Sequence, residues 1–303
     1  MKKYSAESIL LIITLIWGAT FAIIKLALVN VSPMVFISIR FSFAAILLLP
    51  FFLKKSKNIS RSAILSGLLL GVMYFLGFST QTIGLNYTTA TKSGFITGTC
   101  VLFTPIFQYL FEKKKPGKGN LIGVFFVLTG LILLSSKGNS ILDIFHELGS
   151  GFNIGDFFTL LCAVFFAMYI VYLDIISKKY DYLLLVFLQI SITAVMGIIS
   201  VIILSVSGLE NIKFMFSGSL IFAFLYTSIL ATVLTTTFQT KYQKIVTPTK
   251  AGIIFSFEPV FSAVIAYYFI HEKISRFSFI GGILIFAGLL VSELFDKFIK
   301  SNE

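Results

Sequence analysis

The amino-acid sequence predicts an all-α integral membrane protein with ten transmembrane helices, arranged as two five-helix repeats of inverted topology. Three observations predict this fold. The composition is 57% hydrophobic and only 12% charged, whereas soluble domains carry about a quarter charged residues. The chain contains ten apolar stretches of membrane-spanning length. The last five of these stretches resemble the first five at a nearly constant offset.

The composition also excludes several classes of protein. The 35 phenylalanines exceed what a water-facing surface could cover, which excludes a soluble enzyme and a secreted disulfide scaffold. The two cysteines, Cys100 and Cys162, lie within apolar stretches and form no CxxC pair. We therefore interpret them as small buried residues and expect neither a metal site nor a bound cofactor.

The ten predicted helices follow from runs of about 20 apolar residues, the length that crosses the hydrocarbon core. The first five run over 8–29, 33–53, 62–83, 91–111 and 120–136, and the second five over 155–176, 182–206, 218–239, 249–269 and 277–295. A polar segment separates the two sets and ends in Gly149-Ser150-Gly151. We therefore expect a first repeat over 8–136, a linker over 137–151 and a second repeat over 152–293.

The basic residues predict the orientation of these helices. With the amino terminus inside, 17 of the 24 Lys and Arg residues fall in inside segments and 5 in outside loops. This positive-inside pattern predicts a multi-pass protein of the cell (inner) membrane with both termini cytoplasmic. Because the net charge of +11 is spread over separate loops, we expect contact with membrane lipids and no binding of nucleic acid.

Two offsets relate the halves of the chain. A shift of 158 residues places Thr91-Lys92-Ser93-Gly94 on Thr249-Lys250-Ala251-Gly252, Gln81 on Gln239, Gly123 on Gly281 and Gly130 on Gly288. Nearer the start of each half, a shift of 149 residues pairs Trp17 with Phe166 and Arg40 with Gln189. Since five spans is an odd number, the second repeat must cross the membrane in the opposite sense. Inverted repeats are typical of secondary transporters, whose substrate site lies between the repeats near the midplane.

A series of short motifs resembles a known family. The motifs are Trp17-Gly18-Ala19-Thr20-Phe21, Arg40-Phe41, the segment Thr88 to Gly98 leading to Pro105, Phe257-Glu258-Pro259-Val260-Phe261, His271-Glu272-Lys273, and Gly281, Gly282 and Gly288. In this order they resemble the drug/metabolite transporter superfamily in its ten-helix form with two EamA-type repeats, over 8–136 and 152–293. The first half departs from the pattern by carrying Lys113-Lys114-Lys115 where the second half has Glu272. The resemblance implies export or exchange of small metabolites, amino acids or drug-like compounds.

Two charged residues lie within predicted spans, where a charge costs roughly 2.5–3.5 kcal/mol. Arg40 and Glu258 approach similar depths from opposite ends of their helices. We hypothesise that both face a central cavity, where Arg40 attracts a carboxylate or phosphate and Glu258 binds a cationic group or a coupling proton. The alternative is that each is a structural polar residue, for example one that pairs with the other.

Polar and aromatic residues add further candidates for substrate contact. Gln81, Gln189 and Gln239 each place an amide near the middle of a span, where it can bind substrate or join helices. Trp17 and Tyr169 lie centrally in the first span of each half. Their rings can stack on a substrate or hold a cation, although aromatic residues also serve in packing.

Two prolines predict kinks in the fourth and ninth spans. Pro105 and Pro259 each lack a backbone N–H donor and disfavour helical geometry in the preceding residue. Broken helices at membrane depth are tolerated where they line a cavity. The kink at Pro259 therefore favours a cavity-facing Glu258, and packing is the alternative explanation for both kinks.

We expect a secondary transporter of a small molecule and not an enzyme. The sequence contains no HExxH or GxSxG cluster and no GxxxxGK[ST] motif, so catalysis and ATP-driven transport are disfavoured. A channel is disfavoured because no repeated filter loop is visible. A sugar-phosphate or nucleotide-sugar exchanger of the same plan would require more cationic residues at depth than Arg40 alone.

Overall fold

The structure is a computed structural model that describes residues 3–55, 59–135, 152–208, 212–270 and 275–301. The linker expected over 137–151 and the His271-Glu272-Lys273 motif therefore lie outside the described residues. The division into repeats at 8–136 and 152–293 stays a prediction.

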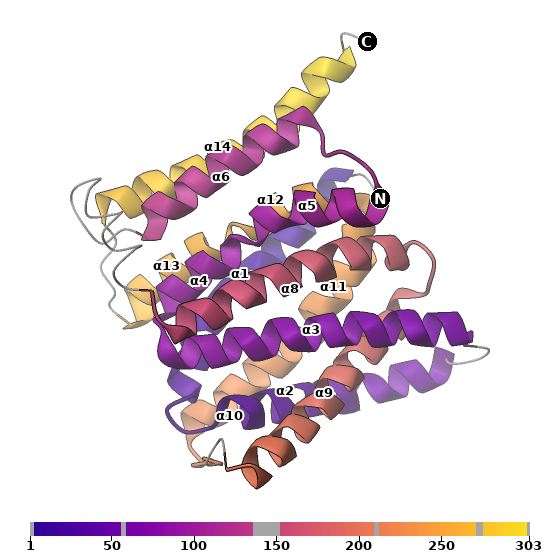
Figure 1. The fold of residues 1–303 in the computed structure, drawn as a ribbon, viewed down its shortest axis with the longest axis vertical. Coiled ribbons are helices and arrows are strands. Elements are labelled where there is room, and N and C mark those ends of the chain that lie inside the picture. Colours follow the sequence, from indigo (N-terminus) through magenta and orange to yellow (C-terminus); the bar gives the residue numbers. More distant parts are fainter. Residues whose placement is uncertain (1–2, 56–58, 136–151, 209–211, 271–274, 302–303) are drawn as a thin grey trace.

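The described residues are almost entirely helical (Figure 1). The first five spans are α1 (Lys3–Ala27), α2 (Pro33–Lys55), α3 (Arg61–Tyr87), α4 (Ala90–Gly98) with α5 (Cys100–Glu112), and α6 (Lys118–Ser135). The second five are α8 (Ile154–Ser177), α9 (Tyr182–Val206), α10 (Gly218–Leu225) with η1 (Tyr226–Leu234) and α11 (Thr235–Tyr242), α12 (Pro248–Phe255) with α13 (Glu258–Ile270), and α14 (Arg276–Ser301). A short 3-10 turn, η2 (Gln243–Ile245), follows α11. Each of the ten predicted spans is thus met by helix in the described residues, which confirms an all-α membrane fold.

Polar side chains at the helix starts explain where several spans begin. Ser60 accepts a hydrogen bond from the Ala63 amide at the start of α3, and Thr89 accepts one from the Lys92 amide at the start of α4. Asn153 and Asp156 form a capping box at the start of α8. These bonds satisfy amides that the first helical turn leaves unpaired.

The fourth and ninth spans are interrupted at equivalent positions. The fourth breaks at Thr99, and the ninth breaks at Ser256 and Phe257. The 158-residue offset carries Thr99 to Phe257, so the two breaks are repeat mates. Pro105 lies inside α5, six positions beyond the break. The break at Thr99 is therefore separate from the kink expected at Pro105, which stays a prediction. In the ninth span the break directly precedes Glu258 and Pro259, so Pro259 lies in the first turn of α13. Proline is tolerated in a first turn, because the amide that it lacks would have no partner within the helix.

The second, fourth and fifth spans of the first half pack antiparallel on their counterparts in the second half. Gly197 of α9 lies against Ser38 near the start of α2, while Phe187 near the start of α9 stacks on Phe52 near the end of α2. The fourth and ninth spans cross in the same sense, because Gly98 lies against Pro259 and Gly252 against Thr104. Opposite directions of equivalent helices are what two repeats of inverted topology require.

The last spans of each half form the clearest such pair, α6 against α14 (Figure 1). Gly123 lies against the carbonyl of Gly288, and Gly130 lies against the carbonyl of Gly281. The 158-residue offset carries Gly123 to Gly281 and Gly130 to Gly288, so each contact is the symmetry mate of the other. The packing therefore indicates a pseudo-twofold relation between the halves, and the glycines permit the close approach of the backbones.

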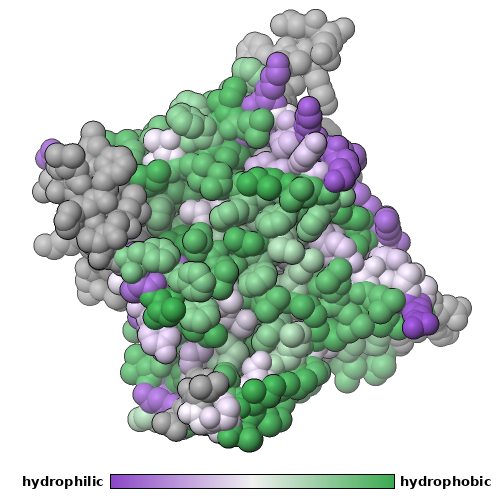
Figure 2. Space-filling model, viewed as in Figure 1, coloured by the Kyte–Doolittle hydropathy of each residue, from purple (hydrophilic) through white to green (hydrophobic). Residues whose placement is uncertain are grey.

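The surface matches a protein embedded in lipid. Figure 2 shows hydrophobic residues over most of the viewed face, with hydrophilic residues along the edge where the N-terminus lies in Figure 1. Large apolar side chains such as Val206 and Phe216 are 84% and 78% exposed. Lysines cluster where α1, α6 and α12 begin and where α2, α5 and α8 end. We call this the lysine-rich end of the bundle.

We predict that the glycine contacts between α6 and α14 are required for stability. A Cβ at Gly130 would lie 2.6 Å from the carbonyl oxygen of Gly281, a backbone atom that cannot move aside. Gly130→Ala should therefore destabilise the protein by about 1–3 kcal/mol. The measurement is the thermal unfolding midpoint in detergent. Gly282→Ala is the matched control, because its Cβ would lie 3.7 Å from Val260; equal midpoints for the two variants would contradict the packing.

Candidate functional site

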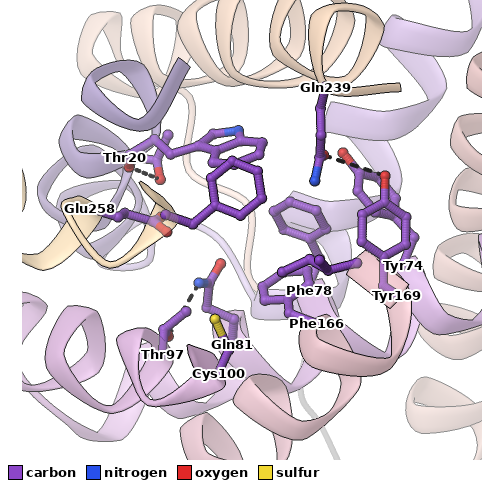
Figure 3. Close-up of a pocket in the computed structure, with 13 residues that line it drawn as sticks. Thr20, Tyr74, Phe78, Gln81, Thr97, Cys100, Phe166, Tyr169, Gln239 and Glu258 are labelled. Atoms are coloured by element: carbon purple, nitrogen blue, oxygen red, sulfur yellow. Dashed lines mark hydrogen bonds between the residues drawn. The ribbon is translucent and has the colours of Figure 1, made fainter. Parts of the chain in front are cut away.

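A cavity lies at the centre of the bundle, between the two halves (Figure 3). Its empty volume is about 510 Å³, including the part open to solvent, which is within the range of ligand sites. Thirteen residues line it: Trp17, Thr20, Tyr74, Phe78, Gln81, Thr97, Cys100, Phe166, Tyr169, Ile170, Gln239, Phe255 and Glu258. Six of them are aromatic, and both halves of the chain contribute.

The lining is built largely from repeat mates. Ten of the thirteen residues form five pairs under the two offsets: Trp17 with Phe166, Thr20 with Tyr169, Gln81 with Gln239, Thr97 with Phe255, and Cys100 with Glu258. The members of each pair come from opposite halves yet line the same space. The cavity therefore lies on the pseudo-twofold axis, where two inverted repeats meet.

The two helix breaks form one side of the cavity. Thr97 and Cys100 flank the break at Thr99, and Phe255 and Glu258 flank the break in the ninth span. The two residues at each break are three positions apart, a spacing that places side chains on one face of a helix. Breaks of this kind occur at membrane depth where they line a cavity.

Glu258 is the acidic residue of the lining. Within the described residues, no hydrogen bond or ion pair reaches its carboxylate, and part of its side chain is exposed into the cavity. Figure 3 shows it beside Thr20 and opposite Gln239. A carboxylate removed from bulk water is costly without a proton or a cationic partner. The geometry thus leaves this group available to one or the other.

The wall around Tyr169 is a connected hydrogen-bond network. The Tyr169 hydroxyl lies 2.8 Å from Oε1 of Gln189 and 3.4 Å from Oε1 of Gln239. Gln239 donates to Gln243 over 2.9 Å, and Gln243 donates to the Ile170 carbonyl over 2.7 Å. Tyr169 and Gln239 still line the cavity, whereas Gln189 does not. The network holds these polar groups in fixed positions inside the bundle.

The π-helix η1 supplies an acceptor shared by Trp17 and Arg40. The Trp17 Nε1 donates to the Ala231 carbonyl at 3.3 Å and to the Thr235 hydroxyl at 3.0 Å. The Arg40 guanidinium donates to the same carbonyl at 3.2 Å and to Thr232 at 2.9 Å. In a π-helix the backbone hydrogen bonds join residues five apart in place of four, and such turns are common at functional sites.

Arg40 lies behind the cavity wall and not in it. The guanidinium is fully buried, and its Cζ lies 4.7 Å from the centre of the Phe78 ring, which is itself a lining residue. Because its donors bind Thr232 and Ala231, the hypothesis that Arg40 faces the cavity is corrected here. Arg40 is also not paired with Glu258.

Of the other predicted site residues, Trp17, Gln81, Tyr169, Gln239 and Glu258 line the cavity. Gln81 donates to Thr97 at 3.4 Å, which joins α3 to α4. Contact of these residues with a substrate stays a prediction.

The lining residues that the sequence analysis did not select as substrate contacts are Thr20, Thr97, Cys100, Phe166 and Phe255, together with Tyr74, Phe78 and Ile170, which have no repeat mate in the lining. The first five are repeat mates of other lining residues. Applying the two offsets to every candidate would have identified Phe166 from Trp17, Thr20 from Tyr169, and Cys100 from Glu258.

Comparison with known proteins places the chain among membrane transporters. The model of the EamA-like transporter family matches residues 5–136 and 153–294. A protein of Archaeoglobus fulgidus named "Uncharacterized transporter" is 31% identical over 296 residues, covering 97% of this chain and 87% of its own. The Bacillus subtilis "Uncharacterized transporter YyaM" is 26% identical over 312 residues, covering 100% of this chain and 98% of its own.

A solved crystal structure shows the same fold. It superposes with a TM-score of 0.74 at 16% identity, covering 97% of this chain and 99% of that chain. The likeness extends over the whole bundle, including both halves.

We predict that the buried guanidinium depends on its acceptor in η1. Thr232→Val removes the oxygen that accepts from Nε of Arg40, and an unsatisfied donor on a buried charged group costs about 1.5–3 kcal/mol. The thermal unfolding midpoint in detergent should fall accordingly. Thr237→Val is the matched control, since among the described residues its hydroxyl bonds only to the Val233 carbonyl, four positions earlier in the same span. If the two variants unfold alike, Arg40 does not depend on this contact.

Proposed function

Because the chain belongs to the EamA-like transporter family, we propose that it moves a small organic molecule across the cell membrane by alternating access around the central cavity. The observation that carries the proposal is the lining of that cavity by five pairs of repeat mates. Two halves of like shape and opposite orientation can exchange conformations, which opens a shared site first to one side and then to the other.

The proposed orientation places the lysine-rich end and both termini in the cytoplasm. The excess of Lys and Arg in the segments at that end supports it. In this orientation the basic loops lie against the anionic lipid of the inner leaflet. The chain has no ATP-binding motif, so the proposed energy source is an ion gradient or exchange, with export as the direction that the family resemblance suggests.

The chemistry of the cavity favours a substrate with a cationic group and an apolar body. Glu258 supplies a carboxylate that has no partner in the described part of the chain, and the rings of Trp17, Tyr74 and Phe255 face the same space. Aromatic faces and a carboxylate together attract a protonated amine. The same carboxylate can hold a proton when no substrate is present, which gives proton-coupled exchange a physical basis.

A sugar-phosphate or nucleotide-sugar substrate is the weaker alternative. Such anions are held by Arg and Lys side chains, and no Lys or Arg is among the lining residues of this cavity. Arg40 is the residue that the sequence analysis expected to attract such an anion. Its guanidinium donates to Thr232 and to the Ala231 carbonyl instead. Transport is also favoured over catalysis, because the matched family and its relatives are named as transporters.

We predict that Glu258 is required for transport. Glu258→Gln keeps the size of the side chain and removes its charge, so the rate of counterflow should fall about 10- to 100-fold, the value of one charge-assisted hydrogen bond. The measurement is uptake and counterflow in proteoliposomes with a panel of amines and amino acids, with and without a pH gradient.

Glu112→Gln is the control for loss of a carboxylate outside the cavity lining, and it should transport as the wild type does. Wild-type rates for a correctly inserted Glu258→Gln variant would refute the site. Competition by phosphorylated sugars in place of amines would refute the substrate class.

A further inference from the structure

Two ion pairs lie at opposite ends of the bundle, outside the cavity. Nζ of Lys92, in the first turn of α4, lies 2.6 Å from Oδ2 of Asp156, in the first turn of α8. Nζ of Lys250, in the first turn of α12, lies 2.7 Å from Oε1 of Glu7, near the start of α1. The second pair is at the lysine-rich end, and the first is at the other end.

The two pairs are symmetry mates. The 158-residue offset carries Lys92 to Lys250, and the 149-residue offset carries Glu7 to Asp156. Each lysine is the third residue of the first part of a broken span. The pseudo-twofold that relates the halves of the cavity therefore also exchanges the ion pairs.

Each pair crosses the interface between the halves. Lys92 belongs to the first half and Asp156 to the second, whereas Lys250 belongs to the second half and Glu7 to the first. The Lys92 pair joins the α3–α4 hairpin to α8, and the Lys250 pair joins the corresponding hairpin of the second half to α1. Movement of one half against the other must strain these contacts.

Both pairs are largely shielded from water. The side chains of Asp156 and Lys250 are 0% and 5% exposed, and those of Glu7 and Lys92 are 15% and 29% exposed. When such a pair separates into entering water, hydration of the two charges offsets much of the lost attraction. A shielded pair of this kind can therefore open and close reversibly.

The contacts of Asp156 show which part would move. Its Oδ1 accepts from the Thr88 hydroxyl at 2.7 Å, and Thr88 precedes α4 on the same hairpin as Lys92. Its Oδ2 accepts from the Asn153 amide at 2.8 Å within the capping box of α8. Withdrawal of the α3–α4 hairpin would break the contacts to Thr88 and Lys92 together, while the cap keeps the carboxylate in place.

We propose that these pairs are the two gates of the transporter: Lys92–Asp156 closes the cavity at one end and Lys250–Glu7 closes it at the lysine-rich end. Opening to either side breaks the pair at that side and leaves the other formed. Both pairs are formed in the structure. The inference rests on the proposed function, since it assigns residues to alternating access.

The test uses Cys100, which lines the cavity, as a reporter in a Cys162→Ser background that leaves it as the single cysteine. Its rate of labelling by a membrane-impermeant maleimide is measured in right-side-out and inside-out vesicles. Asp156→Asn should raise labelling severalfold from the Lys92 side and lower it from the lysine-rich side. Glu7→Gln should do the opposite.

Controls separate a gate from a structural contact. Asn153→Ala removes the cap of α8 and keeps the ion pair, so it should leave labelling unchanged. The exchanged pair Glu7→Lys with Lys250→Glu should restore the wild-type pattern, because an acidic residue suits the first turn of α12. If a variant of Asp156 or Glu7 does not insert into the membrane, the same labelling is measured on Lys92→Gln or Lys250→Gln, which removes the basic residue of the same pair.

Two outcomes would overturn the proposal: equal shifts in the same direction for both variants, or wild-type labelling in both. A rise in labelling from both sides, for either variant, would likewise show that the pair only holds the fold. The labelling needs no substrate. If the two variants shift Cys100 labelling in opposite directions but the protein transports none of the tested compounds, the gates are supported and the proposed substrate is rejected.

Discussion

The antiparallel crossing of the two broken spans, where Gly98 lies against Pro259, is the contact on which the site depends. In the bilayer core, a backbone that leaves the regular helix must find its hydrogen bonds within the protein. Both breaks lie at this crossing, and the residues that flank them, Thr97, Cys100, Phe255 and Glu258, line the cavity. The helix interruptions and the cavity are therefore consequences of one arrangement, repeated with opposite orientation.

The symmetry of the backbone contrasts with the asymmetry of the chemistry. Glu258 occupies the position that Cys100 occupies in the other half, and Arg40 the position of Gln189. One half thus contributes the cavity's carboxylate and the other a buried guanidinium that stabilises its wall. In the proposed mechanism, similar shape allows the halves to exchange conformations, while different side chains at equivalent positions give the shared site its preference for one kind of substrate.

Much of this could be predicted from the sequence, because the bilayer imposes simple rules. All ten apolar runs are met by helix in the described residues, and the two offsets found in the sequence relate contacts such as Gly123–Gly288 and Gly130–Gly281. The position of Arg40 behind the cavity wall could not be predicted. Its guanidinium donates to a carbonyl of the π-helix η1, and no sequence motif predicts that π-helix. The break at Thr99 could not be predicted either, since the proline in that span lies elsewhere.

The central claim, that two inverted halves open the cavity alternately, can be tested by distances between spin labels at exposed sites on both ends. Val29 and Ile154, one from each half, lie at one end, and their repeat mates Lys178 and Ser5 lie at the lysine-rich end. Measured in nanodiscs by pulsed dipolar spectroscopy, each pair should show a short and a long distance. Conditions that populate the long distance at one end should populate the short distance at the other. Distances that lengthen together, or a single invariant distance at both ends, would contradict alternating access.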